Sequence, residues 1–196
     1  MSAIVRYVIK MMPYMMLAIP AYLIIRTIFV KVKKIKVNWY REIVMFAFAV
    51  FVVGLASQTI IPKIEIGENG FAIAQNGIHE TNLIPFRVFV ETYNEVFVNG
   101  HVTYFLINIL GNIILFMPFG LVIPLLWKVS CKRTLVIGFC TSLFIEVSQM
   151  FLKRVTDIDD LMLNTMGVLL GVMVYSLLKR CCKTLIGKFE TFSEPV

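Results

Sequence analysis

Five apolar segments, each long enough to cross a lipid bilayer, constrain this 196-residue chain more than any other feature of its sequence. A spanning helix needs about 20 mostly apolar residues, because hydrocarbon offers the backbone no hydrogen-bond partner outside the helix. The segments are Tyr7–Val30, Ile43–Ile61, Val102–Trp127, Thr134–Phe151 and Leu161–Leu178. They predict an all-α integral membrane bundle of five transmembrane helices. A bundle of four, with the first helix lying in the interface, is the alternative, because the first segment contains Lys10 and Arg26.

The composition supports a membrane protein and argues against other classes. Hydrophobic residues make up 59% of the chain and charged residues only 16%, whereas soluble domains average about half and a quarter. A soluble core of this size cannot cover so much apolar surface, so the excess is expected to face lipid. The net charge of +7 comes from bases in short clusters between apolar segments, which disfavours nucleic-acid binding.

The distribution of Lys and Arg predicts the orientation. Twelve bases fall in the connections after the first and third segments and after the fifth, and six fall on the opposite side. Cytoplasmic loops of membrane proteins carry the excess of positive charge. We therefore expect the N-terminus outside and the C-terminus in the cytoplasm, and a four-helix bundle would keep this orientation for the remaining spans.

The chain divides into four parts on this interpretation. Residues 1–61 hold two helices and a basic loop, 62–100 an extracellular subdomain, 101–180 a three-helix core and 181–196 a cytoplasmic tail. In the subdomain, Ile64–Ile66 and Phe71–Ile73 flank the turn sequence Glu-Asn-Gly, which predicts a small hairpin. An amphipathic helix on the outer membrane surface is predicted from apolar residues at helical spacing: Phe86, Phe89, Val90, Tyr93 and Phe97.

Polar residues inside the spans are the candidate functional residues, because an ionisable group in lipid is costly unless it is paired or solvated. Glu146 lies about five residues from the outer end of the fourth span, and Gln149 shares its helix face. Beyond the following turn, Asp157, Asp160 and Asn164 form one stripe, although N-capping and the helix dipole would by themselves account for two of the three Asp residues there.

The third span and the loop contribute further polar groups. Asn108 and Asn112 lie one turn apart in the third span, where Asn commonly forms hydrogen bonds between helices. Pro118 and Gly120 predict a kink, and Gly167 and Gly171 predict close helix packing. We expect an outward-facing polar cavity rather than structural bonding alone, lined by Asn82, Arg87, Asn108, Asn112, Glu146, Gln149, Arg154, Asp157, Asp160 and Asn164.

Two motifs resemble those of the VanZ-like family of bacterial membrane proteins. The first joins Asn82-Leu-Ile-Pro-Phe to Asn108-Ile-Leu-Gly-Asn112 and Phe116-Met-Pro-Phe-Gly120. The second, more specific, runs from Glu146-Val-Ser-Gln149 through Arg154, Asp157 and Asp160 to Asn164 and Gly167. The resemblance covers about half the chain. It implies a plasma-membrane protein of Gram-positive bacteria that confers teicoplanin resistance by lowering lipoglycopeptide binding at the cell surface, and it assigns no role to any single residue.

Three mechanisms fit these residues. The cavity binds an amphiphile, either a lipoglycopeptide or a lipid-linked wall precursor, among the plasma-membrane lipids. Alternatively, Glu146 couples proton movement to transport of an envelope lipid, or it acts as a general base in a lipid-modifying enzyme with Asp157 and Asp160 holding a divalent ion. The enzyme is disfavoured because the sequence has no nucleophile elbow, HExxH motif, Cys/His pair or phosphate-binding Gly loop. No cofactor or metal is expected.

Overall fold

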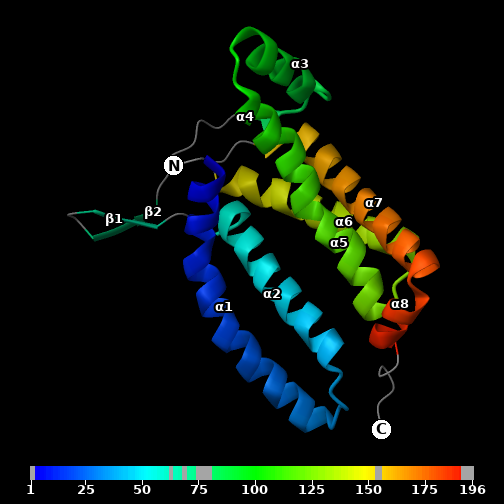
Figure 1. Ribbon diagram of the computed structural model, residues 1–196. Helices are drawn as coiled ribbons and strands as arrows, with labels where there is room; N and C mark the ends of the chain where they lie inside the picture. The colour runs from blue at the N-terminus through cyan, green and yellow to red at the C-terminus, as the bar shows by residue number, and fades with distance from the viewer. Residues whose placement is uncertain (1–2, 62–63, 68–69, 74–80, 153–155, 191–196) are drawn as a thin grey trace.

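A computed structural model shows a bundle of long helices with a short helix across one end (Figure 1). It describes residues 3–61, 64–67, 70–73, 81–152 and 156–190. Within these ranges, five helices are long and apolar enough to cross a membrane. The predicted all-α membrane bundle is confirmed, and the first apolar segment belongs to a helix of full spanning length.

The spanning helices follow the predicted segments, and four of the five begin three or four residues before the predicted start. They are α1 (Ala3–Lys33), α2 (Trp39–Thr59), the continuous α4 (Val102–Phe105), η2 (Leu106–Gly111) and α5 (Asn112–Trp127), then α6 (Cys131–Phe151) and α7 (Ile158–Cys181). Helix α6 begins three residues before the predicted Thr134, where the Ser130 hydroxyl accepts a hydrogen bond from the Arg133 N–H. Its first turn is polar, so hydropathy alone does not reveal it.

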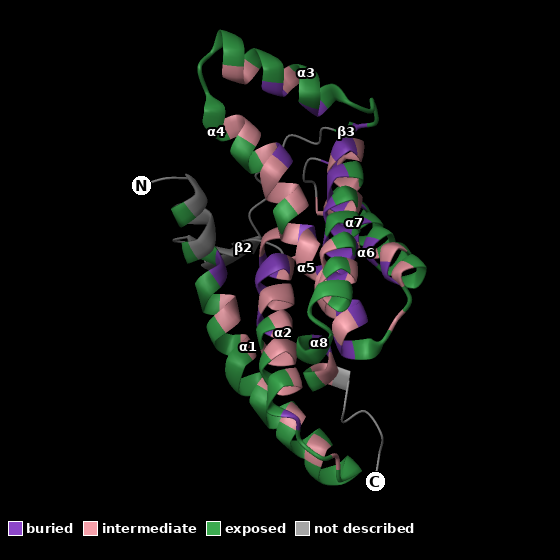
Figure 2. Ribbon diagram, turned by 45° about the vertical axis from the view of Figure 1, so that its right-hand side comes forward, coloured by how far each residue is buried: buried purple, intermediate pink, exposed green. Residues whose placement is uncertain are grey.

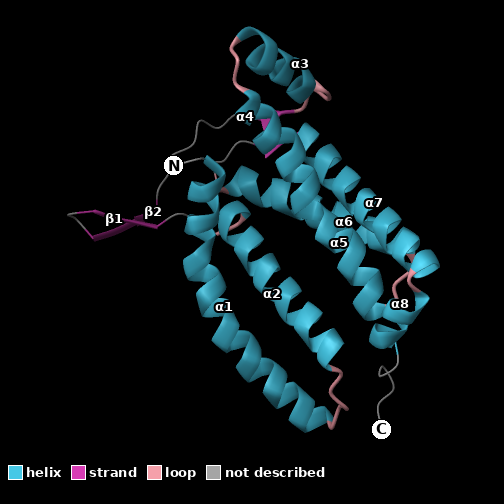
Figure 3. Cartoon of the chain, in the orientation of Figure 1, coloured by secondary structure: helices cyan, strands magenta, loops and turns pink. Residues whose placement is uncertain are grey.

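Short elements complete the chain, as Figure 3 shows by colour. The strands β1 (Ile64–Gly67) and β2 (Gly70–Ile73) pair antiparallel, which confirms the predicted hairpin. The predicted loop helix is present as α3 (Arg87–Tyr93) followed by the π-helical turn η1 (Asn94–Val98). Strands β3 (Thr81–Asn82) and β4 (Thr156–Asp157) pair in parallel, and α8 (Lys183–Glu190) ends the described chain.

The third span departs from regular geometry at a place the sequence did not predict. Helix α5 continues through Pro118 and Pro124. The irregular segment is η2, one wide π-helical stretch at Leu106–Gly111, immediately before α5. Such stretches are rare and often lie beside functional residues, and this one contains Asn108 and ends where Asn112 begins α5.

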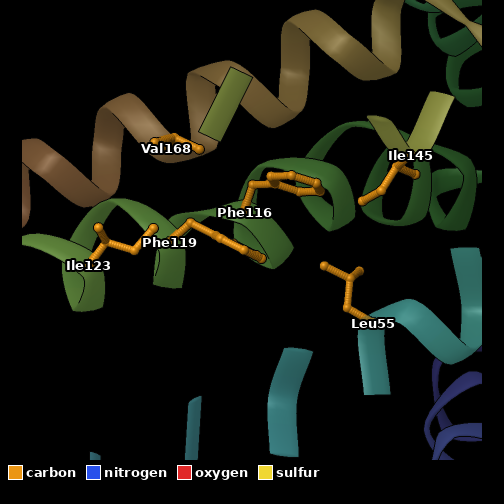
Figure 4. Close-up of a cluster of buried hydrophobic side chains, with 6 residues drawn as sticks. All are labelled: Leu55, Phe116, Phe119, Ile123, Ile145 and Val168. Carbon is orange, nitrogen blue, oxygen red and sulfur yellow. The ribbon is translucent and has the colours of Figure 1, made fainter. Parts of the chain in front are cut away.

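Aromatic and aliphatic side chains from four helices form the core (Figure 4). Leu55 of α2, Ile145 of α6 and Val168 of α7 converge on Phe116 and Phe119 of α5. The rings of Phe116 and Phe119 are stacked with centroids 5.3 Å apart. Figure 2 shows the buried residues on the facing sides of the central helices, while α1 is mostly exposed. Because side chains from α2, α6 and α7 all pack against α5, α5 is the central helix of the bundle.

Glycines let α5 and α7 approach closely. A Cβ atom at Gly167 would meet the Ile113 carbonyl oxygen, and one at Gly171 would meet the Met117 carbonyl oxygen. On the other side of the interface, a Cβ atom at Gly120 would meet the Val168 carbonyl oxygen. Each obstacle is backbone, which cannot move aside as a flexible side chain can. The two helices thus pack at a separation that only glycine permits at these positions.

Helix α8 holds the opposite end of the bundle from α3. The side-chain amide of Asn38, the N-cap residue of α2, donates a hydrogen bond to the Lys188 carbonyl oxygen over 2.7 Å. The Lys188 ammonium lies 5.1 Å from the centre of the Tyr40 ring, and Phe189 packs edge-on against the same ring. Ile186 is buried. The last helix is therefore fastened to the start of the second.

Candidate functional site

The carboxylate of Asp159 anchors α3 to the bundle. It is 1% exposed and accepts hydrogen bonds from two backbone N–H groups, that of Phe86 over 2.5 Å and that of Val88 over 2.8 Å. Phe86 precedes α3 with a positive φ of 69°, a conformation that costs energy for a non-glycine residue. Asp159 therefore holds the backbone in place where α3 begins, a role that its position in the first turn of α7 did not predict.

Asp157 completes this anchor from the N-cap position of α7. Its Oδ1 accepts one hydrogen bond from the Asn82 amide over 2.9 Å and another from the Asp159 N–H over 2.8 Å. The parallel pairing of β3 with β4 places Asn82 beside Asp157. Burial raises the pKa of the Asp157 carboxyl, and the hydrogen bonds from Asp159 and Asn82 only partly oppose this effect. We call Asn82, Asp157 and Asp159 the loop anchor.

The position of Asp157 corrects one prediction. Asp157, Asp160 and Asn164 were expected to share a helical stripe, but Asp157 precedes the helix with extended backbone geometry. Its carboxylate turns toward the loop at Asn82 instead of continuing the face that carries Asp160. The competing rule is N-capping, because an Asp at this position satisfies a backbone N–H that the helix leaves without a partner.

Glu146 lies directly beneath the loop anchor. Glu146 is 5% exposed, and its Oε2 accepts a hydrogen bond from the Asp157 N–H over 3.1 Å. The charges of Asp157 and Asp160 lie within electrostatic reach of the Glu146 carboxylate. Three acidic side chains, one from α6, one from the N-cap of α7 and one from its first turn, are thus close together at the α3 end of the bundle.

Asn112 connects α5 to this acidic group. Its amide nitrogen donates to Asp160 Oδ1 over 2.5 Å and to the Asn108 carbonyl oxygen over 3.0 Å. The structure therefore brings Asn112 and Asp160, two of the expected cavity residues, into contact, whereas Asn108 contributes its backbone carbonyl to this contact. The amide uses both of its N–H donors in these two bonds.

Asn164 lies one turn farther along α7 and is 4% exposed. Its amide nitrogen donates to the Ser142 hydroxyl of α6 over 2.9 Å. Its carbonyl oxygen, Oδ1, is buried and has no hydrogen-bond partner among the described residues. A buried acceptor without a donor costs free energy, so such atoms usually mark a place for water or a ligand. We call Asn112, Ser142, Glu146, Asp160 and Asn164 the polar layer.

Three other predicted site residues, Arg87, Gln149 and Arg154, are not part of the polar layer or the loop anchor as the structure describes them. Arg87 is on the exposed surface of α3, where its Nε donates to Glu91 over 2.6 Å. Gln149 is half-buried on α6, just beyond Glu146. Arg154 lies outside the described residues. The polar layer is thus built by residues of α5, α6 and α7, with Arg87 outside it.

Sequence reasoning missed two contributors to this region. Asp159 belongs to the loop anchor; the helix dipole already accounts for an acid in the first turn of α7, so no signal in the sequence indicated its bonds to Phe86 and Val88. Tyr104, near the start of the third span, donates its hydroxyl to Glu91 over 2.7 Å and so ties α4 to α3. Within the described ranges, no group of three His, Cys, Asp or Glu side chains has the geometry to hold a metal ion.

Comparison with known proteins bears on these residues directly. A family model described as VanZ/LLP1 matches residues 43–179, which is more than half of the chain. No curated protein and no solved structure matches the chain. The matched segment includes every residue of the polar layer and of the loop anchor, and it leaves out α1.

Proposed function

This chain belongs to the VanZ/LLP1 family, and from that premise we propose that it protects cells against teicoplanin and related lipoglycopeptides. In this proposal the protein lowers binding of the antibiotic at the cell surface. It does so by binding an amphiphile, the lipoglycopeptide itself or the lipid-linked wall precursor it targets. The polar layer binds the head of the amphiphile, and the tail lies between or beside the helices.

The proposed orientation puts the polar layer near the outer face of a bacterial plasma membrane. The bases of the α1–α2 and α5–α6 connections and of α8 mark the cytoplasmic side by the positive-inside rule. With five spans, the N-terminus is then outside and the C-terminus inside. The loop anchor and α3 lie on the outer side, where a wall precursor and a glycopeptide meet.

The unpartnered Oδ1 of Asn164 is the observation that carries this proposal. It is buried in the matched segment, and the neighbouring side chains already satisfy one another: Asn112 with Asp160, and Asn164 with Ser142. Buried polar atoms usually have a hydrogen-bond partner, so an acceptor without a donor in this layer favours a bound donor there. A bound hydroxyl or amine would supply that donor.

The chemistry of the polar layer suits a ligand that is rich in hydrogen-bond donors. Asp160 and Glu146 present carboxylate oxygens, and Asn164 presents an amide oxygen. Carboxylates accept hydrogen bonds from sugar hydroxyls and pair with ammonium groups. Both groups occur on glycopeptides and on wall precursors. The exposed apolar side chain of Phe144, two residues before Glu146 on α6, offers apolar surface for an acyl chain.

The test compares surface labelling by fluorescent teicoplanin in Gram-positive cells that express the wild type, Glu146→Gln, Asp160→Asn or Glu95→Gln. Fluorescent vancomycin, which has no lipid tail, is the reference antibiotic. Glu95→Gln is the matched control, because it makes the same chemical change at a carboxylate that binds exposed His101. Membrane levels of all four proteins are matched by immunoblotting.

We expect the wild type and Glu95→Gln to lower teicoplanin labelling selectively, and the two polar-layer variants to lose this effect at normal membrane levels. Unchanged labelling with the wild type would overturn the proposal. Loss of Glu146→Gln and Asp160→Asn from the membrane would instead show that these residues stabilise the bundle, and the polar layer would then not be a binding site.

A further inference from the structure

A cavity lies at the α8 end of the bundle, remote from the polar layer. Its volume is about 580 Å³, within the range of ~300–1,000 Å³ that is typical of small-molecule sites. Three separate segments line it: the α5–α6 connection with the first residue of α6, the last turns of α7, and the first residue of α8. The lining residues are Lys128, Val129, Ser130, Cys131, Tyr175, Ser176, Lys179, Arg180 and Lys183.

The charge of this cavity is entirely positive. Lys128, Lys179, Arg180 and Lys183 line it, and no acidic residue does. Within the described residues, none of the four takes part in a salt bridge; the pairs found there are Arg26–Glu42, Arg87–Glu91 and His101–Glu95. The four bases come from three segments, and together they give the cavity a positive charge that would attract an anion.

Neutral groups around the bases suit the same kind of ligand. The N-terminus of α6, a helix of 21 residues, opens at Cys131, and the first N–H groups of a helix carry partial positive charge. Ser130, Tyr175 and Ser176 also line the cavity, although the Ser176 hydroxyl donates to the Val172 carbonyl oxygen. The Cys131 sulfur lies 3.9 Å from the Ser176 hydroxyl oxygen, so the two walls are in contact at this point.

Topology and helix stability explain part of this charge but not its arrangement. Bases near the end of α7 favour the helix dipole, and bases on this side favour a cytoplasmic location. Neither effect requires Lys128, before α6, and Lys183, after α7, to face one cavity. We propose that the cavity binds a phosphate group, that of an anionic phospholipid headgroup in the cytoplasmic leaflet.

The surroundings favour a lipid over a soluble phosphate. Trp127 immediately precedes Lys128 and is 48% exposed, as expected of an aromatic residue at the membrane–water interface. Met173, one turn before Ser176 on α7, is 58% exposed and lies toward the membrane interior. A phosphate held by the bases would therefore have apolar surface beside it for its acyl chains. Basic pockets between helices on this side are the usual sites for anionic headgroups.

The test measures thermal unfolding of the full-length protein in micelles during titration with short-chain phosphatidylglycerol. Short-chain phosphatidylcholine and inorganic phosphate are titrated in parallel. The variants are the double substitution Lys128→Gln/Lys183→Gln, the charge-preserving Lys128→Arg/Lys183→Arg, and the matched control Lys33→Gln/Lys34→Gln. The control removes two exposed bases on the same side that do not line the cavity.

We expect phosphatidylglycerol to stabilise the wild type, the Arg variant and the control at similar concentrations, and the Gln variant only at about tenfold higher concentration or more. Stabilisation by inorganic phosphate at the same concentrations as phosphatidylglycerol would assign the site to a soluble phosphate instead of a lipid. Equal stabilisation by phosphatidylcholine, or equal loss in the control, would overturn the proposal. If the Gln variant does not fold, loss of the stabilisation in Lys128→Gln alone provides the same comparison.

Discussion

Asn112 of α5 and Asp160 of α7 form the hydrogen bond that joins the two most closely packed helices inside the membrane. The donor nitrogen and the acceptor oxygen are 2.5 Å apart, and the residues are 48 positions apart in the chain. Because the same amide also donates to the Asn108 carbonyl oxygen, both of its N–H groups are occupied. The bond therefore fixes the rotation of α7 relative to α5 at the depth of the polar layer.

Substitutions of these two residues should differ in how much they lower the free energy of unfolding. Asn112→Ala should lower the free energy of unfolding by about 2 kcal/mol, since a buried hydrogen bond is lost and the Asp160 carboxyl loses its donor. Asp160→Asn should cost less, because the new amide oxygen still accepts the bond from Asn112. Unfolding in mixed micelles by titration with denaturing detergent measures both. Equal losses in the two variants would contradict this assignment.

The loop anchor predicts a local effect for Asp159. Asp159→Ala should raise hydrogen exchange at the start of α3, because the N–H groups of Phe86 and Val88 lose their acceptor. Asp159→Asn should have an intermediate effect, since its single amide oxygen can accept only part of this pair. Exchange is measured by mass spectrometry on peptides that cover residues 83–93. Glu95→Gln, at a partly exposed carboxylate outside the loop anchor, should leave exchange in these peptides unchanged.

The glycine contacts predict which helix substitutions the bundle tolerates. Gly171→Ala should lower the free energy of unfolding by about 1–3 kcal/mol, because its Cβ meets the backbone of α5. Gly187→Ala in α8 has open space around its Cβ and should be neutral or slightly stabilising. Thermal unfolding in micelles compares the two. A neutral Gly171→Ala variant would show that α5 and α7 can separate without cost.

The buried Asp157 carboxyl predicts a pH dependence. Burial raises its pKa above the ordinary value of 3.8, so the folded protein holds this proton to a higher pH than the unfolded chain does. Stability from this group is therefore present at low pH and falls as the pH rises through the raised pKa. Asp157→Asn keeps the Oδ1 that accepts both hydrogen bonds but cannot ionise.

We expect the melting temperature of Asp157→Asn to fall less than that of the wild type between about pH 4 and pH 7. The difference between the two profiles isolates residue 157 from the other acids in the region. Parallel profiles would mean that the Asp157 pKa is the same in the folded and unfolded protein.

The ion pair between α1 and α2 predicts that substitutions of its two residues have non-additive effects on stability. Arg26 donates to both carboxylate oxygens of Glu42, over 2.8 and 2.5 Å, and both side chains are mostly buried. Glu42→Gln alone should cost about 3 kcal/mol, because the Arg26 charge stays in the apolar bundle without its partner. The double variant Arg26→Met/Glu42→Met should be close to the wild type. Additive costs in a double-mutant cycle would contradict this.

Much of the fold could be predicted because length and hydropathy are local properties. The five spans, the hairpin and the loop helix follow from composition and spacing within about 25 residues each. The irregular η2 segment could not be predicted, since no residue pattern marks a π-helical turn there. The start of α6 was misplaced because its first turn is polar, and hydropathy responds only to apolar residues.

The candidate site could be predicted in part for a similar reason. Helical spacing places Asp160 and Asn164 on one face, and the cost of a polar side chain in lipid pointed to Glu146 and Asn112. The role of Asp159 depends on partners 71 and 73 residues away, and no periodicity reports a contact at that separation. Whether the polar layer binds a ligand stays a prediction.

The contact between Asn38 and Lys188 constrains the order of assembly. These residues are 150 positions apart, so the start of α2 leaves the ribosome long before the helix that fastens it is synthesised. Helices α1 and α2 must therefore enter the membrane before the hydrogen bond between Asn38 and α8 can form. The bundle closes only after its last helix emerges, and translation itself sets the earliest moment at which this side of the protein is complete.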